Sequence, residues 1–126
     1  MKVAYVDTSC LVCTRLSQPG SAAVAKKLGK FDQLFSANLL EAEIHSVMAR
    51  EHIVPTSDLL KGIRWIIPNR TLHDEIAKVL SAGYVRGADC WHLATALYLA
   101  DDVGSMSFLT LDERQRSVAR TLGFGE

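Results

Sequence analysis

Aspartate residues stand where apolar, strand-like stretches of this sequence end or where helix-like stretches begin. Asp7 directly follows the stretch Val3–Val6, and Asp112 lies two residues beyond Thr110, which ends another such stretch. Asp89 opens a long apolar stretch with the length of a helix. Each aspartate alone is explained by helix capping, because a carboxylate accepts hydrogen bonds from the free N–H groups of a first helical turn. Together, however, the three positions indicate a binding site, because parallel sheets bind ligands at the carboxyl ends of their strands.

A fourth acidic side chain is expected from the helix that Asn38 is predicted to cap. Its apolar residues recur at helical spacing, and Glu41 and Glu43 flank this apolar stripe on either side. Periodicity does not choose between the two glutamates. Either one, taken alone, could be a solvated residue at the edge of the stripe.

Carboxylates that converge in one cleft repel each other, and a bound cation stabilises such an arrangement. Hard oxygen ligands favour Mg²⁺ or Mn²⁺ over zinc. Thr8, Ser9 and Thr110 lie beside two of the acids and add hydroxyl groups that could hold a carboxylate or a water molecule. The chemistry that such a site suits is hydrolysis of a phosphodiester bond.

The elements that must position these acids alternate between strand-like and helix-like along the chain. We expect strands at residues 2–6, 31–36, 65–67 and 108–110, and helices at residues 8–16, 21–29, 38–51, 71–80, 89–100 and 112–122, with a further helical turn or two at 57–62. Alternation of this kind implies parallel strands joined by right-handed crossovers. The expected fold is therefore α/β: a three-layer α/β/α sandwich around a parallel sheet of about four strands, in one domain spanning residues 1–126.

Composition limits the class of protein further. The chain has 126 residues, of which 48% are hydrophobic, and its 14 basic and 14 acidic residues cancel. Affinity for a nucleic acid would have to come from bound metal ions and local cations, because bulk charge supplies none. Two groups of cations are candidates, although each could be a solvated helix face: Lys26, Lys27 and Lys30, and Arg114, Arg116 and Arg120. With no secretory signal and no apolar run long enough to span a bilayer, we expect a cytoplasmic protein.

Four motifs in this order resemble the PIN-domain nucleases, and most closely the single-domain VapC-type toxins of toxin–antitoxin pairs. These are Asp7-Thr8-Ser9, Glu41-Ala42-Glu43-Ile44, the run from Arg86 to Ala96, and Thr110-Leu111-Asp112. The closing Ala119–Phe124 segment extends the resemblance over almost the whole chain. Two departures are the bulky pair Cys90-Trp91 beside Asp89 and a last edge strand that is very short or missing.

The resemblance implies a ribonuclease whose acids hold one or two Mg²⁺ or Mn²⁺ ions. The family's acidic set falls on Asp7, Glu43, Asp89 and Asp112, with Ser9 and Thr110 at its small polar positions. The resemblance favours Glu43 over Glu41. His92 matches a position where family members often have histidine, and we expect it to be structural. The implied substrate is RNA, and the implied partners are a small protein antitoxin and a second copy in a homodimer.

Other functions stay open at this point. Cys10-Leu11-Val12-Cys13 follows a strand and opens a helix, as in thioredoxin-like redox proteins. A zinc site could use Cys10, Cys13, Cys90 and His92, although a Cys-x-His pair on one helix points its ligands apart. A phosphatase of the haloacid dehalogenase type also begins with a strand and an aspartate, but it needs a second aspartate where Ser9 stands. A PIN-like fold could also bind RNA or protein without cutting it.

Overall fold

The structure is a computed structural model that describes residues 1–126. Its four strands are β1 (Val3–Val6), β2 (Gln33–Ala37), β3 (Ile63–Ile66) and β4 (Met106–Leu109). Its helices are α1 (Thr8–Arg15), α2 (Ser21–Leu28), α3 (Leu39–Arg50), α4 (His73–Ala82), α5 (Gly87–Leu99) and α6 (Glu113–Leu122), with a short 3₁₀ helix, η1 (Val103–Ser105). None of the helices is long and apolar enough to cross a membrane.

All four strands run parallel, in the order β3-β2-β1-β4. The connection from β1 leads to β2 on one side, whereas β4 returns to the other side, so the strand order reverses at β1. This reversal opens a crevice beyond the carboxyl ends of β1 and β4. The two ends are joined by a hydrogen bond from the Asp7 amide to the Leu109 carbonyl at 2.9 Å. The expected α/β/α sandwich around a four-stranded parallel sheet is confirmed.

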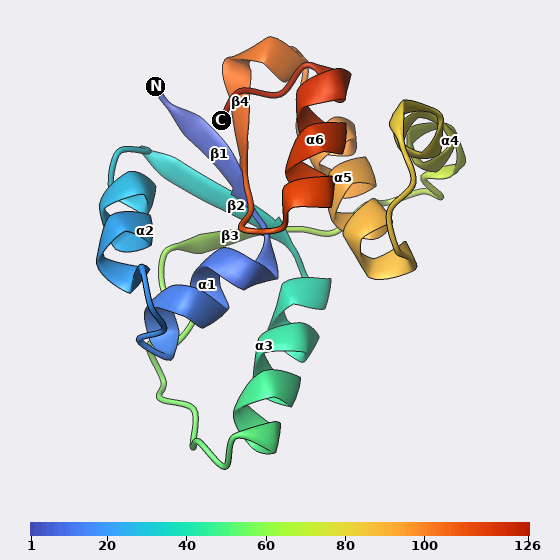
Figure 1. Cartoon of the computed structure of the whole chain (residues 1–126). Helices are drawn as coiled ribbons and strands as arrows, with labels where there is room; N and C mark the ends of the chain where they lie inside the picture. Colours follow the sequence, from blue (N-terminus) through green and yellow to red (C-terminus); the bar gives the residue numbers. More distant parts are fainter.

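Helices cover both faces of the sheet (Figure 1). The side chains of β1 alternate between these two faces. Ala4 and Val6 point into a core shared with α1, α2 and α3. Tyr5 points to the opposite face, into a core shared with α4, α5 and α6. In Figure 1 the helix α3 leaves the carboxyl ends of the strands and extends away from the sheet, while both termini lie near the amino ends.

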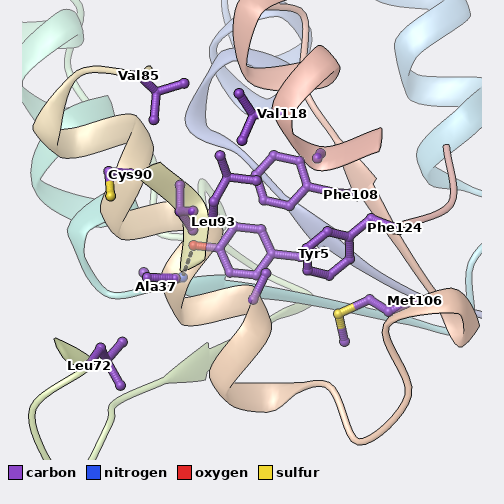
Figure 2. Packing of buried hydrophobic residues seen from close by; sticks show 14 of the residues in the cluster. Tyr5, Ala37, Leu72, Val85, Cys90, Leu93, Met106, Phe108, Val118 and Phe124 are labelled. Carbon is purple, nitrogen blue, oxygen red and sulfur yellow. Dashed lines mark hydrogen bonds between the residues drawn. The ribbon is translucent and has the colours of Figure 1, made fainter. Parts of the chain in front are cut away.

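Tyr5 lies at the centre of the second core. Its ring stacks on Phe108 of the neighbouring strand with centroids 5.1 Å apart, and Phe108 contacts Phe124 in turn. Figure 2 shows this row of rings and the hydrogen bond that the Ala37 amide donates to the Tyr5 hydroxyl at 3.0 Å. The rings fix β1 against β4, while the hydroxyl remains available for polar contacts near the end of the strand.

The structure corrects several local expectations. Asn38 precedes α3 but has helical backbone angles and makes no capping hydrogen bond, so it is not the predicted cap. Residues 57–62 form consecutive turns and no helix, with Gly62 at a positive φ of 88°. The 3₁₀ helix η1 was not predicted. One expectation is confirmed here: the last edge strand, expected to be very short or missing, is a single parallel bridge between Ser107 and Gly125.

Candidate functional site

Asp7 is the most firmly held acid in the crevice. It is only 5% exposed, and it caps α1 by accepting a hydrogen bond from the Ser9 amide at 3.4 Å. The same oxygen, Oδ2, accepts from the Ser9 hydroxyl at 2.9 Å and lies 3.1 Å from the Thr110 hydroxyl. The simple interpretation as a helix cap is therefore correct, and it also fixes the carboxylate at the strand end.

Gln115 connects the other two aspartates to this arrangement. The backbone N–H of Gln115 donates to Asp112 Oδ1 at 2.8 Å, so Asp112 caps α6. Its side chain is fully buried, accepts from the Thr110 hydroxyl at 2.7 Å and donates to the backbone carbonyl of Asp89 at 3.3 Å. Ser9 and Thr110 thus occupy the supporting positions that were predicted for them.

Glu43 reaches the crevice from α3 and lies 2.6 Å from His92 on α5. The same carboxylate oxygen accepts from the Thr8 hydroxyl at 2.8 Å. Burial acts to raise the pKa of Glu43, but the hydrogen bonds from His92 and Thr8 outweigh it and hold that pKa below its ordinary value. Glu41 is exposed and takes no part in this network. The structure therefore brings Glu43, and not Glu41, to the other acids.

A chain of hydrogen bonds fixes the tautomer of His92. The Tyr5 hydroxyl accepts from the Ala37 amide, so its own proton is free to go to His92 Nδ1 at 2.6 Å. Nδ1 is then the acceptor, and Nε2 carries the proton that faces Glu43. Nε2 also lies 3.6 Å from Asp7 Oδ1. His92 is fully buried, as expected of a structural histidine, but it also orients Glu43 and lies close to Asp7.

Asp89 lies in the first turn of α5 and does not cap it, because the helix begins at Gly87. Its pKa is raised above the ordinary value, first by burial and then by the negative charges of Asp7, Asp112 and Glu43, while His92 opposes the shift. Asp89 is therefore close enough to the other three carboxylates for their charges to oppose its ionisation. Asp112 is the exposed member of the set, and Asp89 is partly buried.

The donor chemistry of these residues fits a hard divalent cation, because every candidate ligand is a carboxylate. A cation would also relieve the repulsion that raises the pKa of Asp89. In this conformation, however, no three His, Cys, Asp or Glu side chains are grouped as a metal site. Asp7 and Glu43 are turned toward hydroxyl and imidazole donors of the protein instead.

An open groove of about 670 Å³ lies between α1 and α3 at the edge of the acid site. Thr8 and Ser9 line it from α1, Glu43 and Ser46 line it from α3, and Leu111 closes one end. A substrate in this groove would lie directly against Glu43 and beside the hydroxyl that holds Asp7.

The geometry removes two of the alternative functions. Cys10 is buried, and burial, followed by the negative charge of Asp7, raises the pKa of its thiol to about 12, whereas a redox cysteine needs a lowered pKa. The predicted zinc set lacks a free imidazole, because Tyr5 and Glu43 take both ring nitrogens of His92. All three cysteines are free thiols in buried positions.

Sequence reasoning missed two residues of this site. Tyr5 was considered only as part of an apolar strand, although a phenol among aliphatic side chains signals a hydrogen-bond partner at its tip. Gln115 stands three residues after Asp112, at capping-box spacing, which points only to a local capping role. Its side chain does not return to that cap, and its fully buried amide joins Thr110 to α5 instead.

Comparison with known proteins agrees with this geometry. The sequence profile of the PIN domain matches residues 4–121. Ribonuclease VapC46 of Mycobacterium tuberculosis is 30% identical to this chain over an alignment of 132 positions. The alignment covers 98% of this chain and 95% of that protein. No solved structure matches the chain with comparable significance. The chain therefore belongs to the PIN-domain family and, within it, to the VapC type.

Proposed function

We propose that this PIN-domain protein is a metal-dependent endoribonuclease, the toxin of a VapBC-type toxin–antitoxin pair. The observation that carries the proposal is the convergence of Asp7, Asp89 and Asp112 with Glu43 at one edge of the sheet, where the other three carboxylates oppose the ionisation of Asp89. A purely structural set of caps would not need Glu43, which comes from α3 and caps nothing. Similarity to a ribonuclease over nearly the full chain supports the choice of RNA as substrate.

The chain's own residues would divide the work as follows. Asp7 would be the central ligand, because the Ser9 amide and hydroxyl hold it in one orientation at the end of β1. Glu43 would be aimed by His92 and Thr8. Asp89 and Asp112 would approach from the other side of the crevice, at the starts of α5 and α6.

The carboxylates of Asp7, Glu43, Asp89 and Asp112 would hold Mg²⁺ or Mn²⁺, which supplies an activated water and stabilises negative charge at the phosphate. The protein would hold the scissile phosphate beside the groove between α1 and α3, with the RNA strand lying along Ser9 and Glu43. Attack by water on the phosphorus, with cleavage of the P–O3′ bond, would leave 5′-phosphate and 3′-hydroxyl ends and would not use the 2′-hydroxyl of the RNA.

We also propose the partners that the VapC type implies. A small protein antitoxin would cover the acid site, and two copies of the chain would form a homodimer. Because the substrate would be cellular RNA, the protein would act in the cytoplasm.

Analysis of the product ends tests the reaction. Purified protein with Mg²⁺ or Mn²⁺ should cut single-stranded RNA to fragments that a 5′-phosphate-dependent exonuclease degrades. RNA methylated at every 2′-hydroxyl should still be cut. Fragments with 2′,3′-cyclic phosphates would contradict this chemistry, and absence of any cleavage would favour the alternative, a PIN-like module that binds RNA or protein without cutting it.

A further inference from the structure

A second hollow, here called the α2–α6 pocket, lies next to the acid site and is separate from the groove described above. It has a volume of about 290 Å³, and its apolar wall includes Val24 and Leu28 of α2 and Leu109 of β4. Small-ligand pockets range upward from roughly 300 Å³, so this one has room for a single nucleotide-sized unit.

Three cations line the α2–α6 pocket, and they come from both groups that the sequence singled out. Lys27 belongs to α2, whereas Arg116 and Arg120 belong to α6. The two arginines are four residues apart, so they share one face of the helix. Arg116 is held by hydrogen bonds to the Thr110 carbonyl at 2.8 Å and to Glu113 at 2.6 Å. Cations that are far apart in the sequence therefore meet at one pocket.

A carboxylate of the protein already lies among these cations. Glu126 lines the pocket and pairs with Arg120 at 2.5 Å. This hydrogen bond, followed by the positive charges of Arg120, Arg116 and Lys27, lowers the pKa of the Glu126 carboxyl. Glu126 thus shows that an anionic group fits beside Arg120 in this pocket, and the pocket lining retains an excess of positive charge.

The α2–α6 pocket is continuous with the acid site. Thr110 lines the α2–α6 pocket, and its hydroxyl lies 3.1 Å from Asp7 Oδ2 in the acid site. Leu111 lies between this pocket and the groove beside Glu43, and its amide donates to Ser9. A strand held in the groove would pass over Leu111 and enter the pocket.

We propose that the α2–α6 pocket binds one nucleotide of the RNA strand next to the cleavage point. Its phosphate displaces the Glu126 carboxylate from Arg120 and lies among Lys27, Arg116 and Arg120. Its sugar and base lie against Val24, Leu28 and Leu109. The proposal rests on the proposed ribonuclease function and adds a binding site for the flanking part of the substrate.

Binding measurements on charge variants test the pocket. The probe is a fluorescent single-stranded RNA of about ten nucleotides, a length typical of single-strand sites. All variants are made in an Asp7→Asn background so that the RNA is not consumed. Lys27→Gln and Arg120→Gln remove pocket cations, whereas Lys26→Gln and Arg114→Gln remove cations of the same helices that do not line it.

The pocket variants should each weaken binding by roughly tenfold, as expected for removal of a charged hydrogen bond. They should also lower the slope of log affinity against log salt by about 0.7 for each phosphate that is no longer neutralised. Glu126→Gln should have the opposite effect and tighten binding, because it removes the competing carboxylate. This gain separates a binding role from a merely structural role of the pocket.

Equal affinities for the pocket variants and their controls would overturn the proposal, as would weaker binding by Glu126→Gln. The ribonuclease function is judged separately, from cleavage by the wild-type protein. If the wild type cuts RNA but the pocket variants bind RNA like their controls, the ribonuclease function would be supported and the binding role of the α2–α6 pocket would be refuted.

Discussion

The acids of the site are held in two different ways. Asp7 and Glu43 accept several hydrogen bonds from buried groups, which fixes their orientation before any ligand arrives. Asp89 receives no such support and is opposed by the charges of its neighbours. The fixed carboxylates of Asp7 and Glu43 would define the position of a cation. The ionised form of Asp89 would be stabilised most when that cation is bound.

Tyr5→Phe tests the chain of hydrogen bonds that aims Glu43. Loss of the hydroxyl leaves the Ala37 amide without its acceptor and His92 Nδ1 without its donor. We expect RNA cleavage to fall by about 10–100-fold, as for other residues that orient metal ligands. The free energy of unfolding should fall by about 1–3 kcal/mol, because a buried donor becomes unsatisfied.

Tyr98→Phe is the matched control for this variant. Tyr98 lies on α5, and its hydroxyl bonds only to exposed Asn69. Its removal should change neither cleavage nor urea denaturation by a comparable amount. Unchanged cleavage by Tyr5→Phe would show that the orientation of His92 does not matter for the reaction.

Asp89→Asn tests the repulsion between the acids through its pH dependence. The pKa of Asp89 is raised in the folded protein, so its ionised form destabilises the fold at neutral pH. This cost is relieved as the pH falls through the folded-state pKa and is gone below the unfolded-state pKa. The variant should therefore melt a few degrees higher than wild type at pH 7, and the gain should shrink toward pH 4.

Mn²⁺ should raise the melting temperature of the wild type at pH 7 more than that of Asp89→Asn, because the variant lacks a ligand. Asp74→Asn, in the exposed first turn of α4, is the control for removal of one negative charge. A gain for Asp89→Asn that is equal at pH 4 and pH 7 would contradict the electrostatic explanation.

At the scale of elements, α5 and α6 set the positions of most of the site. Both Asp89 and His92 lie on α5, which is buried continuously from His92 to Ala96 and cannot shift without disturbing the core. Gln115 then joins α6 to α5 and to the end of β4. The site is therefore rigid because its helices are packed and bonded to one another.

Thr95 is an exception within α5, because its fully buried hydroxyl has no hydrogen-bond partner. Replacement by valine keeps the shape and removes the unsatisfied group, so Thr95→Val should stabilise the protein by up to about 1 kcal/mol. Chemical denaturation measures this change. Thr121→Val is the control, because the exposed Thr121 hydroxyl donates to the Ser117 carbonyl. Destabilisation by Thr95→Val would imply a partner for this hydroxyl.

At the scale of the whole molecule, charge is separated although the total is zero. Four carboxylates gather at the end of β1, and three cations gather on the other side of Thr110, in the α2–α6 pocket. A neutral protein can hold RNA in this way, because cations close to the bound phosphates contribute far more than distant ones. The expectation that local groups must replace bulk charge is consistent with this distribution.

Sequence reasoning reached the layers, the parallel sheet and the segments that carry the acids, because apolar periodicity and strand ends are local features. It could not choose Glu43 over Glu41 without the family resemblance, because both flank the same stripe and only the hydrogen bond of Glu43 with His92 on α5 separates them. It also missed the links made by Tyr5 and Gln115. Each joins segments far apart in the sequence, so no local pattern reveals its partner.

Local patterns also misled in two places. Asn38 has the right residue type for a cap, but its backbone already adopts helical angles, which turns its side chain away from that role. Residues 57–62 have a helix-like composition, yet they form turns between α3 and β3.

The most direct test of the acid site is cleavage of RNA by Asp7→Asn in the presence of Mg²⁺ or Mn²⁺. The substitution keeps the size of the side chain and its ability to accept from Ser9, while it removes the charge. We predict that cleavage is abolished while the circular dichroism spectrum is unchanged and the metal-free melting temperature is equal or higher, because repulsion with Asp89 is relieved. Full activity in a folded Asp7→Asn protein would contradict the assignment of Asp7 as the centre of the site.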